Sequence, residues 1–139
     1  MKSLTGRILI VDDEPEIRAL IAEILVQDGF EIQEAGSATE AVRILHVFAP
    51  SLLITDYNLP DDANGGELVE RAKRMLPHIK CLMLTGWREL PSHLSSSPQA
   101  DVIMSKPFSV AALELETRRL LSATPREADP KSSVAQEER

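Results

Sequence analysis

Four short apolar runs divide the chain, and none of them alternates with polar residues. They are Ile8–Val11, Leu52–Thr55, Cys81–Leu84 and Val102–Met104. Continuous apolar runs of this length are typical of parallel strands that are buried on both faces. The more polar segment Glu31–Ala35 predicts a strand at the edge of the same sheet.

Helical periodicity fills the intervals between these strands. Apolar residues spaced by three and four positions from Ile17 to Leu25 predict a first helix, with Asp13 as its N-cap and Asp28-Gly29 at its end. Strands that alternate with helices form right-handed βαβ units, so the sequence predicts an α/β fold around a doubly wound parallel sheet. Three further helices are predicted. The first begins with a capping box at Ser37 and Glu40, and the last is capped by Ser109. The residues predicted to face inward are Leu68, Ala72, Met75 and Leu76 in the middle helix and Val110, Leu113, Leu120 and Leu121 in the last.

Two segments do not fit this regular alternation. Residues 86–100 contain two prolines and four serines, which predict only a short or irregular fourth helix. Residues 124–139 hold one β-branched apolar residue and no aromatic residue, so they bury too little surface to offset the entropy cost of ordering. We therefore expect one domain over residues 1–123 and a disordered tail over residues 124–139.

The charge balance narrows the possible partners. Twenty-two acidic residues against 15 basic ones give a net charge of −7, which argues against nucleic-acid binding through a basic surface. The basic cluster Arg71-Lys73-Arg74 is interpreted as a solvated helix face, with contact to an acidic partner as the alternative. No segment approaches the roughly 20 apolar residues that span a membrane. The single cysteine, Cys81, cannot form an internal disulfide. We expect a cytoplasmic protein without nucleic-acid or membrane partners.

Reactive side chains follow four of the predicted strands. Asp12 and Asp13 follow the first of them along the chain, Asp56 follows the strand at Leu52, and Thr85 and Lys106 follow the last two. In open α/β sheets, ligands bind beyond the carboxyl ends of the strands. The sequence therefore predicts that three carboxylates, a hydroxyl and an ammonium group converge at one edge.

Three ionised carboxylates in one place need a counter-charge, and Mg²⁺ takes such oxygen ligands. Beside Asp56 the cation would assist that carboxylate as a nucleophile toward a phosphoryl group. Lys106 would hold one phosphoryl oxygen, and Thr85 would donate a hydrogen bond to another. Each residue also has a simpler explanation by itself: a helix cap for Asp13, turns for Asp56 and Thr85, and a solvated side chain for Lys106. Their common placement favours phosphoryl transfer.

Four motifs in this order resemble the receiver domain of bacterial two-component response regulators, over roughly residues 5–123. The motifs are Ile8–Glu14, Asp56–Pro60, Leu84–Gly86 and Ser105–Phe108. The resemblance implies a flavodoxin-like sheet of five strands in the order 2-1-3-4-5. With about 120 ordered residues expected, we interpret the chain as a single-domain receiver without an attached DNA-binding or enzymatic output domain.

The resemblance further implies a role for each reactive residue. Asp56 would be the phosphoacceptor, Thr85 and Lys106 would contact the phosphoryl group, and the Lys106–Pro107 peptide bond would be cis. The phosphodonor would be a sensor histidine kinase or a histidine phosphotransfer protein, and an unknown protein would receive the signal. Such a domain catalyses only its own phosphorylation and dephosphorylation. The ligands of Mg²⁺ would be the carboxylates of Asp12, Asp13 and Asp56 and the backbone carbonyl of Asn58.

The position of the usual aromatic switch departs from the family pattern. Ile103 stands where the family carries Tyr or Phe, and a β-branched side chain has few χ1 states to exchange. The irregular segment before it offers no firm helical face for dimerisation. We therefore expect a monomer that does not dimerise strongly through this surface when it is phosphorylated.

Two other functions compete with the receiver interpretation. An α/β phosphatase or phosphotransferase would use Asp56 as a nucleophile on external substrates, although Asn58 stands where a general acid would be expected two residues later. An interaction module that is never phosphorylated is the third possibility. The complete set of reactive residues at the strand ends argues against that module.

Overall fold

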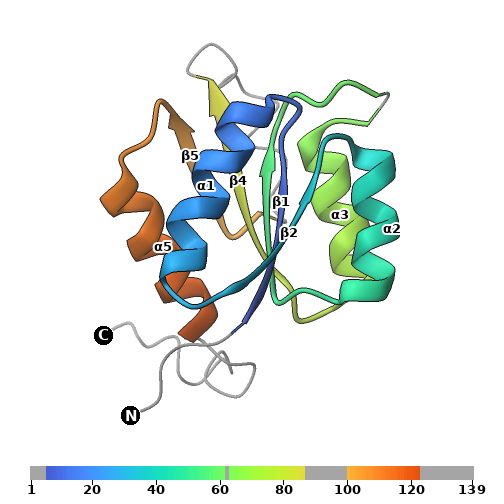
Figure 1. Ribbon diagram of the computed structural model, residues 1–139. Helices are drawn as coiled ribbons and strands as arrows, with labels where there is room; N and C mark the ends of the chain where they lie inside the picture. The colour runs from blue at the N-terminus through green and yellow to red at the C-terminus, as the bar shows by residue number, and fades with distance from the viewer. Residues whose placement is uncertain (1–5, 62, 87–99, 123–139) are drawn as a thin grey trace, which may run out of the picture.

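The computed structural model describes residues 6–61, 63–86 and 100–122 (Figure 1). Five strands form one parallel sheet in the order β2-β1-β3-β4-β5, which confirms the predicted α/β fold and strand order. The strands are β1 (Arg7–Val11), β2 (Glu31–Ala35), β3 (Leu52–Asp56), β4 (Lys80–Gly86) and β5 (Val102–Lys106). The helices are α1 (Pro15–Gln27), α2 (Ala38–Phe48), α3 (Gly65–Met75) and α5 (Val110–Ser122).

The sheet lies between two layers of helices. Helices α1 and α5 cover one face, and α2 and α3 cover the other (Figure 1). Alternate residues of β1 enter different cores: Ile8 and Ile10 pack in the cluster that includes α1 and α5, whereas Leu9 and Val11 pack in the cluster that includes α2 and α3. All four are buried, as expected for a central parallel strand with helices on both sides.

The start of α1 differs from the prediction. Glu14 is the N-cap residue and its side chain makes no capping hydrogen bond, so the assignment of Asp13 as the cap is wrong. The backbone N–H of Glu14 instead donates to Asp12 Oδ1 at 2.9 Å. Aspartate readily accepts a bond from the backbone two residues later, and here that bond fixes the carboxylate of Asp12 at the strand end.

The other helix starts follow local capping chemistry. Ser37 accepts a hydrogen bond from the N–H of Glu40 at 3.2 Å, and Ser109 accepts one from Ala112 at 2.9 Å, as predicted for both helices. Helix α3 begins after Asn64, which forms a reciprocal capping box with Glu67 that was not predicted. This cap fixes where the loop after β3 ends.

The β5 edge of the sheet is less buried than its apolar sequence suggested. Residues along β5 alternate between half-buried and exposed, and Ile103 is 39% exposed. Val110 was predicted to face inward but is also exposed, because α5 packs on the core through Leu113 and the half-buried Leu120 and Leu121. The predicted irregular fourth helix, apart from its flanking residues, and the predicted tail lie outside the described residues.

Candidate functional site

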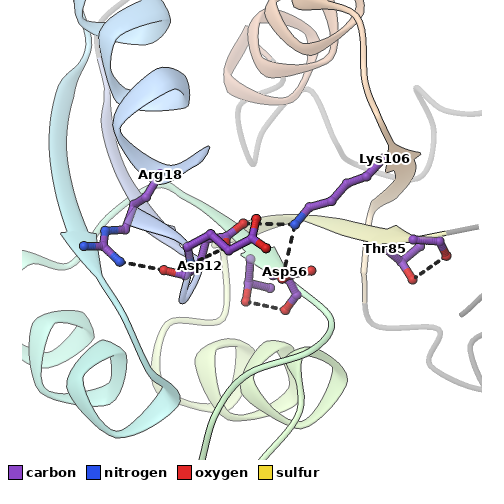
Figure 2. A network of polar contacts seen from close by, with 8 residues as sticks. Asp12, Arg18, Asp56, Thr85 and Lys106 are labelled. Atoms are coloured by element: carbon purple, nitrogen blue, oxygen red, sulfur yellow. Dashed lines mark hydrogen bonds and ion pairs between the residues drawn. The ribbon is translucent and has the colours of Figure 1, made fainter. Parts of the chain in front are cut away.

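The carboxyl ends of β1, β3 and β5 bring three charged side chains together. Asp12 directly follows β1, Asp56 ends β3 and Lys106 ends β5. Lys106 Nζ lies 3.2 Å from Asp12 Oδ2 and 3.2 Å from Asp56 Oδ2, so one ammonium group bridges two carboxylates (Figure 2). This confirms the predicted convergence for these three residues. The Lys106–Pro107 bond is cis, as expected.

A third carboxylate lies beside this bridge. Asp12, Asp13 and Asp56 each offer one oxygen, and these oxygens lie within 4.8 Å of one another. Asp12 and Asp56 are buried, with 1% and 7% of their surface exposed, whereas Asp13 faces solvent. Oxygen atoms grouped in this way suit a hard divalent cation that keeps some of its waters.

Burial and neighbouring charges tune the site. Burial raises the pKa of Asp56 from 3.8 to about 6; Lys106 opposes this rise, the charge of Asp12 adds to it, and a backbone hydrogen bond from Asn58 lowers it. Burial alone would lower the pKa of Lys106, but the charges of Asp56 and Asp12 outweigh it and raise that pKa. Lys106 therefore stays protonated and supplies positive charge to two crowded carboxylates.

Thr85 reaches the same edge of the sheet with a different orientation. It is buried in β4, one residue after Leu84, the register partner of Asp56. Its hydroxyl donates to the carbonyl of Gly86 at 3.3 Å, and Figure 2 shows it to one side of the bridged carboxylates. Its contact with a phosphoryl group stays a prediction, as does a metal contact by the carbonyl of Asn58.

Arg18 supports the site and was not predicted to do so. Its Nη1 donates to the backbone carbonyl of Asp12 at 2.7 Å, and its Nε pairs with Glu34 of β2 at 3.1 Å. A Cβ at Gly36 would lie 3.3 Å from Nη1, so the glycine leaves room for the guanidinium. The helical pattern gave no signal for this contact, because Arg18 lies between two apolar positions and its partners lie directly after β1 and in β2.

Gly65 is the second residue whose importance is visible only in the structure. Its N–H donates to the carbonyl of Tyr57 at 2.7 Å. A Cβ there would lie 2.8 Å from the Cα of Tyr57 and would also collide with the backbone oxygen of Asp56. The start of α3 therefore packs directly against the backbone of the candidate phosphoacceptor.

We expect Gly65→Ala to destabilise the fold by about 1–3 kcal/mol, because a backbone collision cannot be relieved by a side-chain rotation. Urea unfolding would measure the change. Gly6→Ala is the matched control, since its Cβ would meet only the flexible Leu121 side chain at 3.4 Å. Equal stability of the two variants would contradict the close approach at Gly65.

Comparisons with known proteins agree with this geometry. Residues 8–118 match the family model of the response regulator receiver domain. The chain is 34% identical over 121 residues to the aerobic respiration control protein ArcA of Escherichia coli, covering 86% of this chain and 50% of ArcA. It is 29% identical over 118 residues to the response regulator receiver protein CpdR of Brucella abortus, covering 84% of this chain and 98% of CpdR. A CheY-like receiver domain structure from Methanospirillum hungatei has a TM-score of 0.81 at 31% identity, covering 89% of this chain and 99% of that one.

The chain therefore belongs to the family of response regulator receiver domains of two-component systems. It spans half the length of ArcA and nearly all of CpdR. The match favours the receiver interpretation over an α/β phosphatase that acts on external substrates. Among the described helices, none is long and apolar enough to cross a membrane.

Proposed function

We propose that this receiver accepts a phosphoryl group on Asp56, assisted by Mg²⁺ held by Asp12, Asp13, Asp56 and the carbonyl of Asn58. The observation that carries the proposal is the double contact of Lys106 with Asp12 and Asp56 at 3.2 Å each. A sensor histidine kinase or a histidine phosphotransfer protein would supply the phosphoryl group in the cytoplasm.

In the proposed reaction, an oxygen of the Asp56 carboxylate attacks the phosphorus of a phosphohistidine. A P–O bond forms while the P–N bond breaks, and its electron pair returns to the histidine ring. Lys106 exchanges an oxygen of Asp56 for a phosphoryl oxygen and keeps its charge beside it. Thr85 would turn its hydroxyl from Gly86 to another phosphoryl oxygen. Bound Mg²⁺ would neutralise part of the phosphoryl charge.

Hydrolysis of the acyl phosphate on Asp56 would return the receiver to its unphosphorylated state. Water attacks the phosphorus, the P–O bond to Asp56 breaks, and inorganic phosphate leaves while the carboxylate is restored. The response passes to a protein partner through the loops around the site, because Ile103 has no ring to rotate. We propose that the phosphorylated protein remains a monomer.

Incubation with acetyl phosphate and Mg²⁺, followed by intact-mass measurement, tests this function. One phosphoryl adduct that decays slowly to the unmodified protein supports the receiver. Continuous hydrolysis of several phosphate esters would support a phosphatase instead. The absence of both an adduct and turnover would support an interaction module that is never phosphorylated.

A second measurement tests whether Arg18 positions the carboxylates. We expect Arg18→Ala to weaken Mg²⁺ binding roughly tenfold, because it frees the backbone carbonyl of Asp12 from its anchor. Titration calorimetry on the unphosphorylated protein would measure the affinity. Arg118→Ala, which removes an arginine paired with Asp28 in the α1–α5 layer, is the control and should bind Mg²⁺ normally. Equal affinity of both variants would remove Arg18 from the site.

A further inference from the structure

A groove lies between α2 and α3. These two helices form the layer opposite α1 and α5 (Figure 1). Its larger part is a cavity of about 580 Å³ with an apolar floor and two arginines, Arg43 and Arg71. A second cavity of about 230 Å³ adjoins it and adds Arg74. The two parts share four lining residues and so form one continuous groove. The shared residues are Ala38, Val42, Ala63 and Arg71.

The arginines of the groove have no anionic partner in the part of the chain that the structure describes. The basic cluster Arg71-Lys73-Arg74 of α3 separates into two sides. Lys73 pairs with Asp101 at 2.8 Å and also donates to the carbonyl of Ile79 at 3.0 Å. Arg71 and Arg74 instead line the groove, are exposed and form no ion pair there. The predicted solvated face is therefore confirmed for Arg71 and Arg74, which are exposed, but not for Lys73, which is half-buried and paired with Asp101.

The acids along the groove are largely occupied by local hydrogen bonds. Asp61 accepts from the N–H of Thr39 at 2.9 Å and from its hydroxyl at 2.8 Å, and it also accepts from the N–H of Ala38 at 3.2 Å. Glu67 accepts from the N–H of Asn64 at 3.0 Å. Glu70 is the remaining acid and lines only the smaller cavity. These hydrogen bonds hold the carboxylates of Asp61 and Glu67 in place but leave their charge, so the groove as a whole has three arginines against three acids. In the larger cavity two arginines stand against one aspartate, and neither arginine forms an ion pair with the described residues.

We propose that this groove binds an acidic segment of a partner protein. Aliphatic side chains of the segment would cover Ala38, Val42 and Ala63, and its carboxylates would pair with Arg43 and Arg71. Arginine binds carboxylates through two parallel hydrogen bonds, so two unpaired arginines above an apolar floor suit a segment that mixes both residue types. A nucleic acid would leave the apolar residues of the groove, Ala38, Val42 and Ala63, unused.

The groove also lies where a receiver could use it. Asp61 and Ala63 line it, and both belong to the loop between Asp56 and α3. The proposed binding does not require phosphorylation, and it would remain if Asp56 were not the phosphoacceptor.

Fluorescence anisotropy with a labelled peptide of Glu and Leu residues tests the proposal. We expect Arg43→Ala/Arg71→Ala to weaken binding by at least roughly tenfold, since two charge-assisted contacts are lost. Arg118→Ala/Arg119→Ala is the matched control, because it removes the same charge from α5 and should change affinity by less than about twofold. Added salt should weaken binding, and amide shifts on titration should cluster on α2 and α3.

Four results of these binding assays would overturn the proposal, and a competition experiment adds a fifth. The first is that the Glu and Leu peptide does not bind at concentrations up to about 1 mM. The second is that both double variants lower the affinity for the peptide equally, and the third is that a peptide of Lys and Leu residues binds as tightly as the acidic one. The fourth is that poly-U RNA binds more tightly than the peptide and needs Arg43 and Arg71 to do so. Full displacement of the peptide by an equal concentration of glutarate would instead identify a small-anion pocket and contradict a peptide site. Thermal unfolding of each variant verifies that the exposed substitutions leave the fold intact.

Discussion

Asp56→Asn should abolish the phosphoryl adduct, with a loss of at least about 1000-fold in its rate of formation. The amide lacks the ionised oxygen that attacks phosphorus. Within the described residues, the other carboxylate in contact with Lys106 is Asp12, which is only 1% exposed. Intact mass after incubation with acetyl phosphate and Mg²⁺ would measure it. Asp61→Asn is the control, because its carboxylate is occupied by the start of α2. An adduct of equal yield in Asp56→Asn would place the phosphoacceptor elsewhere.

The same substitution should stabilise the protein in the absence of Mg²⁺. The folded-state pKa of Asp56 is about 6 against 3.8 as the reference, so the folded protein binds the proton more tightly than the unfolded chain does. The contribution of Asp56 to the free energy of unfolding therefore falls as pH rises from about 4 through 6 and is level above that range. The full difference corresponds to about 3 kcal/mol, and solvent screening reduces it to about 1–2 kcal/mol.

Urea unfolding of wild type and Asp56→Asn at several pH values would measure this difference. The free energy of unfolding of Asp56→Asn should exceed that of the wild type above pH 6, and this difference should shrink toward pH 4. A gain of the same size at every pH would point to packing rather than to the buried charge as its cause.

The strands could be predicted because they follow from local apolar composition. Their order in the sheet was predicted from the resemblance to receiver domains. Runs such as Ile8–Val11 and Cys81–Leu84 are apolar without interruption, and only a strand covered on both faces uses such a run. The apolar run at β5 led to the same prediction, yet Ile103 is exposed. An apolar run predicts that a strand forms. Whether its side chains are buried depends on which other elements of the chain cover the strand.

The charged residues of the candidate site could be predicted from the sequence, but the residues that hold them in position could not. Asp12, Asp56 and Lys106 could be placed together because the carboxyl ends of parallel strands share one edge. Arg18 and Gly65 could not be predicted. The role of Arg18 depends on its side chain reaching the carbonyl of Asp12, and that of Gly65 on two backbones that approach closely. Such contacts between distant parts of the chain cannot be predicted from the spacing of residues along the sequence.

The hydroxyl direction of Thr85 shows the same limit. Strand position places the residue at the edge, but the rotamer that donates to Gly86 is decided by the local backbone. The groove of arginines between α2 and α3 is a further case. The sequence places Arg71 and Arg74 on one helix, and only the packing of α2 against α3 brings Arg43 to the same cavity.

Lys106→Ala should change four properties of the protein in different directions. Removing the ammonium leaves Asp12 and Asp56 facing each other without a counter-charge, so the pKa of Asp56 should rise above about 6. The unfolding free energy without Mg²⁺ should fall by about 1–2 kcal/mol at neutral pH, less than for a fully buried pair because Lys106 is 22% exposed.

Mg²⁺ affinity should rise several-fold in the same variant, because Lys106 competes with the cation for the same two oxygens at 3.2 Å. Phosphorylation should nevertheless slow by roughly 10- to 100-fold, since the phosphoryl oxygen loses its fixed positive charge. Titration calorimetry and the time course of adduct mass would separate the two effects. Lys80→Ala, at the opposite end of β4, is the control and should leave both unchanged. Weaker Mg²⁺ binding in Lys106→Ala would show that Lys106 orders the carboxylates for the metal instead of competing with it, and unchanged phosphorylation would remove Lys106 from the reaction.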